Sequence, residues 1–261
     1  MMKIGFIGYG HMAEAIAKGL IKAEYTEPRE MYACGRDYEK LNARTGEIGV
    51  RPMETVAEVA RESSIVFICV KPNQVEGVMK ELGDELIGRI VVSVAFGLDF
   101  DKYSAFTKPE IKHISIIPNT PVEVCQGMII CEKKHNLSNP ELDMIERMLR
   151  KLGEVIYLPG DQMWLAGEVA SCGPAFAAMF IEALGDAGAK YGLNREEAYK
   201  IVAQMVAGTG RLQLETEKLP GQMVEEVATP GGVTIKGVTA LREANFSETV
   251  AKAIDAIEEK K

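Results

Sequence analysis

Short apolar runs alternate with amphipathic stretches along residues 1–160 of the chain. The runs predict buried strands, and stretches with apolar residues at i, i+3, i+4 and i+7 predict helices. The predicted strands are 4–7, 30–34, 64–70, 90–95, 111–117, 127–131 and 155–158. The helices expected between them include 56–61, 74–82 and 142–152. This alternation predicts an α/β fold with a parallel, doubly wound sheet.

The pattern changes after Pro159-Gly160-Asp161, where strand-like runs stop and helical spacing continues to the C-terminus. We therefore predict two domains, an α/β domain over 1–160 and an all-helical domain over 161–261. Apolar helices are many for so small a domain, so we expect them to bury their faces against a second copy of the chain. The alternative is a monomer whose helices pack on the first domain.

Composition and charge exclude several classes of partner. The chain has 261 residues, 47% of them hydrophobic and 26% charged, which is typical of a globular protein. A net charge of −8 argues against nucleic acid and anionic membrane as partners. No uninterrupted apolar run reaches the roughly 18–20 residues that span a bilayer. A strand begins by the third residue, so we expect no signal peptide and a cytoplasmic location.

The spacing of cysteine and histidine residues predicts no metal site. The five cysteines include no C-x-x-C pair, which favours free, buried thiols. The three histidines lie far apart, without the H-x-x-x-H or H-E-x-x-H spacing of metal ligands.

A glycine turn follows the first strand. Gly8, Gly10 and Ala13 have the spacing G-x-G-x-x-A and open an amphipathic helix. Gly8 turns the chain, Gly10 leaves room for a pyrophosphate against bare backbone, and the helix N-terminus offers N–H groups to the anion. The turn therefore predicts a Rossmann-type dinucleotide-binding domain. The alternative is a tight strand-to-helix turn that binds nothing.

Arg36 stands about 20 residues beyond this turn, where the adenosine ribose is expected. A guanidinium favours a 2′-phosphate, whereas the neighbouring Asp37 favours a 2′-hydroxyl. We favour NADPH as the cofactor, with NADH as the alternative. Arg36 as a solvated loop cation is the competing interpretation. Other strands end at Lys71-Pro72, at 95–97 and at 118–121, and such ends line one crevice in a doubly wound sheet.

The stretch Thr229–Thr234, TPGGVT, is the candidate site of the second half. Two glycines after a proline place several backbone N–H groups at the start of a predicted helix. Such a nest binds an anion, most plausibly a carboxylate, with the hydroxyls of Thr229 and Thr234 at its rim. A helix-entry turn capped by a threonine is an equal alternative on spacing alone.

Six motifs occur in order along the chain. They are FIGYGHMAEAIAKGL (6–20), VFICVKP (66–72), VVSVAFG (91–97), IIPNTP (116–121), GEVASCGPAF (167–176) and PGQMVEEVATPGGVTIKGV (220–238). In this order, and over essentially the whole length, the chain resembles the pyrroline-5-carboxylate reductase family, of which the last motif is the signature. It departs from the family at 170–174, which often reads SGSGP, and at 94–97, which often contains AAG. Some members have an asparagine where Val56 stands, which leaves Arg36 to set the cofactor preference.

The resemblance implies hydride transfer from NAD(P)H to the C=N carbon of Δ1-pyrroline-5-carboxylate, giving L-proline. It implies that Thr234 hydrogen-bonds the ring nitrogen and relays its proton. The substrate carboxylate would be bound by N–H groups of Gly231, Gly232, Val233 and Thr234, together with Thr229. In the family, two chains interleave their helical domains and complete the substrate pocket across a homodimer, and a higher oligomer is an alternative.

The resemblance also assigns cofactor contacts. The pyrophosphate is expected at Gly8, Tyr9, Gly10, His11 and Met12. Val70, Lys71, Pro72 and Ala95 are expected along the ribose and nicotinamide. Asn119 is expected near the nicotinamide.

Three other functions compete with this one. A β-hydroxyacid dehydrogenase needs a lysine on the helix that opens the second domain, and none occurs between Lys151 and Lys190. A reductase of another cyclic imine stays open, because one methylene changes binding by only about 1–3 kcal/mol. A non-catalytic dinucleotide sensor would have no need of the TPGGVT nest.

Overall fold

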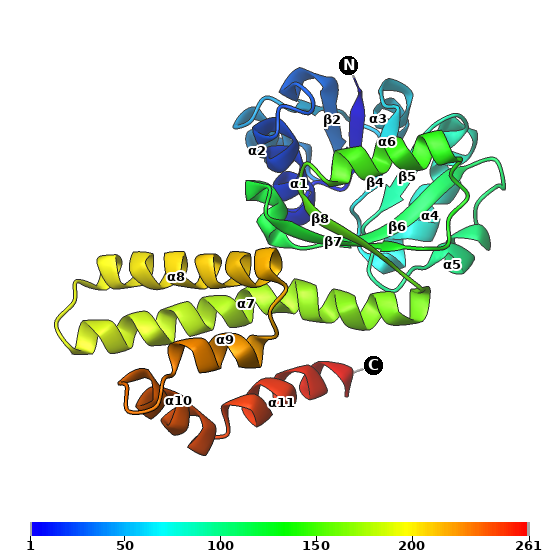
Figure 1. Ribbon diagram of the computed structural model, residues 1–261. Coiled ribbons are helices and arrows are strands. Elements are labelled where there is room, and N and C mark those ends of the chain that lie inside the picture. The colour runs from blue at the N-terminus through cyan, green and yellow to red at the C-terminus, as the bar shows by residue number, and fades with distance from the viewer. Residues whose placement is uncertain (1, 260–261) are drawn as a thin grey trace. The chain divides into compact units, whose positions relative to one another are not determined.

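The computed structural model describes residues 2–259, and the chain divides into two compact units at Pro174 (Figure 1). The first unit contains one eight-stranded sheet, in the order β3-β2-β1-β4-β5-β6-β7-β8. Its strands are β1 (Ile4–Ile7), β2 (Met31–Cys34), β3 (Arg51–Pro52), β4 (Ile65–Ile68), β5 (Ile90–Ser93), β6 (Lys112–Pro118), β7 (Gly127–Glu132) and β8 (Gly153–Leu158). Neighbours from β3 to β6 pair in parallel, which confirms the doubly wound, Rossmann-type sheet.

The expectation of a wholly parallel sheet is wrong at β7. This strand pairs antiparallel with β6, with Ile117 opposite Ile130, and β8 then runs parallel to β7. Residues 119–126 alone connect β6 to β7, mostly as a 3₁₀ turn. A parallel return needs a crossover of a dozen residues or more, so this connection allows only an antiparallel neighbour.

Side chains of the central strands alternate between two apolar layers. In β4, Ile65 and Phe67 belong to one cluster of buried residues, and Val66 and Ile68 belong to another. The first cluster includes residues of α1 (His11–Lys22) and α6 (Asn139–Leu149). The second includes residues of α3 (Val56–Glu62), α4 (Pro72–Leu82) and α5 (Phe100–Ser104). Helices therefore cover both faces of the sheet, which is why its strands read as uninterrupted apolar runs.

Local capping fixes where helices of the first unit begin. These helices are α1 (His11–Lys22), α2 (Tyr38–Gly46), α3 (Val56–Glu62), α4 (Pro72–Leu82), α5 (Phe100–Ser104) and α6 (Asn139–Leu149). Asp37 caps α2 by accepting from the N–H of Lys40 at 3.0 Å. Thr55 and Glu58 form a capping box on α3. Helix α1 differs, because its N-cap Gly10 has no side chain that could accept from the first N–H groups of the helix.

The second unit is all-helical, as predicted. Helix α7 (Gly160–Lys190) enters it, and α8 (Arg195–Thr216), α9 (Pro220–Val227), α10 (Thr234–Glu243) and α11 (Phe246–Glu258) follow. The change from strands to helices occurs at Gly160, but the compact units divide inside α7 at Pro174. The reason is that the first turns of α7 pack on the sheet, where Met163 is buried with Ile117 and Ile130.

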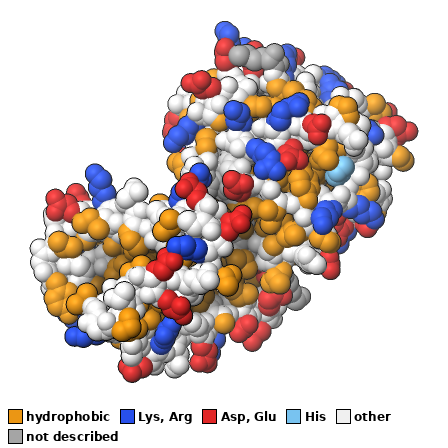
Figure 2. Space-filling model, in the orientation of Figure 1, with side chains coloured by type: hydrophobic (Ala, Val, Ile, Leu, Met, Phe, Trp, Pro, Cys, Tyr) orange, Lys and Arg blue, Asp and Glu red, His pale blue; other side chains and the backbone are white. Residues whose placement is uncertain are grey.

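The second unit buries few of its own apolar side chains. From residue 175 onward, only Ala198, Val202 and Ala228 are buried hydrophobic residues among those described. Exposed ones occur on every helix of the unit and include Met179, Phe180, Leu184, Ile201, Met205, Leu212, Leu214, Val224, Val227, Leu241, Phe246 and Val250. Figure 2 shows hydrophobic side chains on the surface of these helices. Apolar surface of this extent marks a contact site.

Helix α7 is the one helix of residues 2–259 that is long and apolar enough to cross a membrane, judged by length and composition alone. Single polar residues such as Glu168 and Ser171 interrupt its apolar runs, so the runs themselves stay short. Only 11% of its most apolar window is buried within the chain. A helix that covers apolar protein surface passes the same test.

A buried carboxylate lies at the end of β7. Glu132 is 2% exposed, and its Oε2 accepts from the N–H of Phe100 at 2.8 Å. Burial raises the pKa of Glu132 from 4.5 to about 7, and the carboxylates of Asp99 and Asp101 act in the same direction. The pKa of Glu132 is higher in the folded protein than in the unfolded chain. The contribution of Glu132 to the free energy of unfolding is therefore complete below pH 4.5 and is lost as the pH rises to about 7.

We expect Glu132→Gln to stabilise the protein relative to wild type at pH 8 and to do so much less at pH 5. The glutamine oxygen still accepts from Phe100 but carries no charge that must be buried. The measurement is urea-induced unfolding of both proteins at the two pH values.

The control is Glu141→Gln at the capping box of α6. There the N–H of Ser138 holds the pKa of Glu141 below its usual value. Its contribution is therefore nearly complete at pH 5, and the change in stability should be similar at both pH values. An equal effect of Glu132→Gln at pH 5 and pH 8 would contradict the assignment.

Candidate cofactor and substrate sites

The turn between β1 and α1 requires glycine and leaves open space. Gly8 has φ +85°, and a Cβ there would lie 2.8 Å from the carbonyl oxygen of Cys69. At Gly10, a Cβ would meet nothing within 4 Å. The backbone is therefore closely packed behind Gly8 and open at Gly10, as a turn that binds pyrophosphate requires.

A cavity of about 580 Å³ opens at this turn. Its walls include residues that follow three parallel strands: Gly8, Tyr9 and Gly10 after β1, Gly35, Arg36 and Asp37 after β2, and Cys69, Val70 and Lys71 after β4. The remaining walls include Lys40 and Arg44 of α2, Val56 of α3, and Gln74, Val78 and Glu81 of α4. The cavity thus lies at the carboxyl edge of the sheet, where doubly wound folds bind ligands.

Three cations in this cavity have no ion-pair partner among the described residues: Arg36, Lys40 and Lys71. Asp37 instead serves its own helix, because its Oδ1 accepts from the N–H of Lys40. The acid beside Arg36 is therefore engaged as a helix cap. Three unpaired cations beside a bare glycine turn fit a phosphate-bearing dinucleotide.

The thiols and the phenol at the cavity act as neutral groups. Burial raises the pKa of Cys34 to about 11 and also raises the pKa of Cys69. The ring of Tyr9 packs edge-on against Phe6 at 6.0 Å, so the turn presents the backbone of Tyr9. All five cysteines are free, and residues 2–259 contain no group of three His, Cys, Asp or Glu able to hold a metal ion.

The predicted cofactor residues divide into two sets. Gly8, Tyr9, Gly10, Arg36, Val70 and Lys71 line the cavity together. His11, Met12, Pro72, Ala95 and Asn119 do not line it. His11 and Met12 form the first turn of α1, and Pro72 begins α4. The contacts expected of this second set stay predictions.

Asn119 has a structural task in this fold. Its Nδ2 donates to the carbonyl of Ala170 at 3.0 Å, and its Oδ1 accepts from the N–H of Met128 at 2.8 Å. The side chain therefore joins the end of β6 to β7 and α7. The nicotinamide contact expected of Asn119 stays a prediction.

Sequence reasoning missed Lys40 and Arg44. Both follow Arg36 at steps of four residues, and such steps place side chains along one face of a helix. The spacing 36, 40 and 44 was the available signal. What the sequence does not reveal is which of these cations is already paired.

The second unit contains the TPGGVT turn. Gly231 has φ +75°, and the N–H of Gly232 donates to the carbonyl of Thr229 at 3.0 Å. Val233 is the N-cap of α10 and provides no side-chain bond, so the alternative of a threonine-capped helix is wrong. Val233 is 84% exposed, and Thr229 and Thr234 are exposed as well. The uncapped N-terminus of α10 is thus accessible to an anion.

Two family models match the chain. The model described as pyrroline-5-carboxylate reductase dimerisation matches residues 161–261. The model described as NADP oxidoreductase coenzyme F420-dependent matches residues 3–97. The second of these covers β1, the glycine turn and the strand ends that line the cavity.

Solved structures share the whole fold. A Plasmodium falciparum pyrroline carboxylate reductase with NADP bound is similar with a TM-score of 0.87 and 27% identity, covering 99% of this chain and 96% of that one. A 1-pyrroline-5-carboxylate reductase from Streptococcus pyogenes is similar with a TM-score of 0.84 and 25% identity, covering 99% and 97%.

Relatives match in sequence over the full length. The pyrroline-5-carboxylate reductase of Escherichia coli is 33% identical over 99% of this chain and 96% of its own. That of Treponema pallidum is 36% identical over 98% of both chains. With identity at this level across both units, and with the glycine turn and the TPGGVT turn in place, the chain belongs to the pyrroline-5-carboxylate reductase family.

Proposed function

We propose that the chain reduces Δ1-pyrroline-5-carboxylate to L-proline with NADPH, and that the two glycine turns divide the work. The first turn binds the cofactor and the second binds the substrate. The observation that carries this function is that one chain has both turns and is 36% identical to a pyrroline-5-carboxylate reductase over 98% of its length. The chain is accordingly an NAD(P)H-dependent oxidoreductase acting on a C=N group.

The first unit holds the cofactor. The N–H groups at the start of α1 bind the pyrophosphate at Gly8–Met12, because the helix N-terminus carries partial positive charge. Arg36 binds the 2′-phosphate, which favours NADPH over NADH. Val70, Lys71, Pro72, Ala95 and Asn119 complete the cofactor contacts. Reduced nicotinamide, when bound, supplies a hydride to the carbon of the C=N bond.

The second unit holds the substrate. Backbone N–H groups of Gly231, Gly232, Val233 and Thr234, with the hydroxyl of Thr229, bind the carboxylate. The hydroxyl of Thr234 hydrogen-bonds the ring nitrogen and relays a proton to it, and its exposure allows that proton to come from water. A protonated cyclic imine is already electrophilic, so positioning supplies most of the catalysis.

Self-association follows from the second unit. The dimerisation model matches residues 161–261, which include nearly all the helices with exposed apolar side chains. Homo-oligomers with closed symmetry are most often dimers. We therefore propose a homodimer formed through these helices, in which the exposed apolar side chains become buried.

Thr234→Ala should lower kcat by about a hundredfold, which is the lower end of what one positioned proton donor contributes. The affinity for NADPH should be unchanged. The measurement is the loss of absorbance of reduced nicotinamide with Δ1-pyrroline-5-carboxylate, alongside its six-membered homologue. Thr239→Ala, on the same helix, is the control and should behave as wild type. Wild type that leaves the absorbance flat would reject the function, and unchanged turnover in Thr234→Ala would reject the role of Thr234.

Arg36→Glu should shift the preference from NADPH toward NADH by about tenfold or more in kcat/KM, because a carboxylate repels the 2′-phosphate and accepts from a 2′-hydroxyl. Arg29→Glu makes the same charge change outside the cavity and should leave the ratio as in wild type. The ratio of kcat/KM for the two cofactors is measured for all three proteins. If the ratio of kcat/KM for NADPH to that for NADH is the same in Arg36→Glu as in wild type, Arg36 does not bind the 2′-phosphate.

Light scattering at micromolar concentration should give the mass of a dimer. Leu184→Glu on α7 places a charge among the exposed apolar side chains and should shift the mass toward that of one chain. Ile87→Glu, at an exposed apolar residue of the first unit, is the control and should not shift it. A single monomeric species in wild type would contradict the dimer.

A further inference from the structure

An acidic side chain stands one helical turn beyond the glycine turn. Glu14 lies in the first turn of α1, and its N–H donates to the carbonyl of Gly10 at 3.0 Å. A carboxylate here is favourable for the isolated helix, because it faces the positive end of the helix dipole. It is unfavourable for a bound pyrophosphate, because the two negative charges repel each other at the same helix end.

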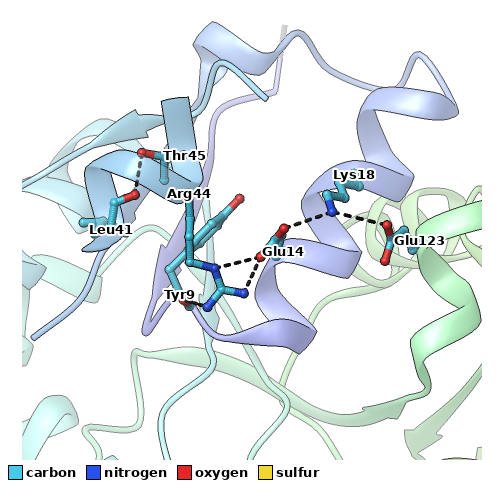
Figure 3. Close-up of polar contacts among 7 residues, drawn as sticks. All are labelled: Tyr9, Glu14, Lys18, Leu41, Arg44, Thr45 and Glu123. Carbon is cyan, nitrogen blue, oxygen red and sulfur yellow. Dashed lines mark hydrogen bonds and ion pairs between the residues drawn. The ribbon is translucent and has the colours of Figure 1, made fainter. Parts of the chain in front are cut away.

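Two cations hold this carboxylate (Figure 3). Arg44 of α2 donates from Nε to Glu14 Oε2 at 2.9 Å, and its Nη2 donates to the same oxygen. Lys18 pairs with Glu14 Oε1 at 2.9 Å and also pairs with Glu123 at 3.3 Å. Burial acts to raise the pKa of Glu14, but the hydrogen bonds from Lys18 and Arg44 outweigh it and lower this pKa. Glu14 is therefore ionised, with a cation on each oxygen.

Arg44 also contacts the turn itself. Its Nη1 donates to the carbonyl of Tyr9 at 3.4 Å, and Figure 3 shows the guanidinium lying between Tyr9 and Glu14. All three guanidinium nitrogens thus donate within this network. Although Arg44 lines the cavity, its donors face the protein, unlike those of Arg36 and Lys40, for which no side-chain bond occurs in the described residues.

We propose that Arg44 is a positioning residue for the cofactor, which acts by neutralising Glu14 beside the glycine turn and not by binding a phosphate itself. This rests on the proposed function, namely that the turn binds the dinucleotide. Side chains of Glu14 and Arg44 are 14% and 23% exposed, so water screens their interaction only in part. Removing Arg44 alone leaves Glu14 with Lys18 only, which Glu123 shares, so the negative charge next to the anion site is less well neutralised.

The test is a double-mutant cycle of Arg44→Gln and Glu14→Gln. NADPH binding is measured without imine, by the fluorescence of the reduced nicotinamide at low salt. Arg44→Gln should raise Kd about tenfold, which is the order of effect of a charge at a helix terminus. Glu14→Gln alone should bind NADPH as tightly as wild type or more tightly. The double variant should return to within about twofold of wild type, because the charge that Arg44 neutralises is absent.

Arg61→Gln is the matched control. Arg61 directs the same two groups, Nε and Nη2, at one oxygen of Glu85, but it lies outside the cavity. Its Kd should equal that of wild type. At saturating NADPH, kcat of Arg44→Gln should stay within about twofold of wild type while KM for NADPH rises, as expected when cofactor binding alone is impaired.

Arg44→Lys keeps a positive charge and loses the fork, and its Kd should lie between those of wild type and Arg44→Gln. If Arg44→Gln fails to fold, the Kd of Arg44→Lys for NADPH serves as the test of the proposal. An unchanged Kd in the Arg44 variants would overturn the proposal. A double variant as weak as Arg44→Gln would also overturn it and would make Arg44 a direct ligand of the cofactor. Wild type that binds no NADPH would reject the proposed function instead.

Discussion

The close approach of the glycine turn to the backbone after β4 is the constraint on which the cofactor site depends. The N–H of Gly8 donates to Cys34 at the end of β2, and the N–H of Cys69 donates to Ile7 at the end of β1. The ends of three strands are thereby joined side by side. Any side chain at position 8 would strike Cys69 and separate them. The cavity exists because these strand ends share one edge of the sheet.

Charge at that edge is arranged locally, against a net charge of −8 for the chain. A dinucleotide brings phosphate charge, so the surrounding acids must be neutralised or directed elsewhere. Asp37 is directed into the cap of α2, and Glu14 is bound by two cations. Arg36 stays without an ion pair. The cavity thus has unpaired cations beside the glycine turn, although the chain as a whole is acidic.

The sequence predicted the features that depend on residues close together along the chain. Apolar runs located the strands, and G-x-G-x-x-A located the cavity. Pairing between distant segments was not predictable from periodicity. The antiparallel β7, the packing of Met163 on the sheet and the ion pair of Arg44 with Glu14 all depend on tertiary contacts. The two-residue strand β3 is too short for any period to appear.

The helical unit combines close internal packing with unpaired apolar surface. At Gly185, a Cβ would lie 2.3 Å from the ring of Tyr199, so glycine lets α7 and α8 approach closely there. The hydroxyl of Tyr199 also donates to Asp186 at 2.8 Å. These contacts fix the helix pair but leave side chains such as Met179 and Ile201 exposed. Hydrophobic burial is the main favourable term in folding. Within one chain, the described part of the helical unit buries only three of its hydrophobic residues, Ala198, Val202 and Ala228. In the proposed homodimer, a second copy would bury these side chains and so would stabilise this unit.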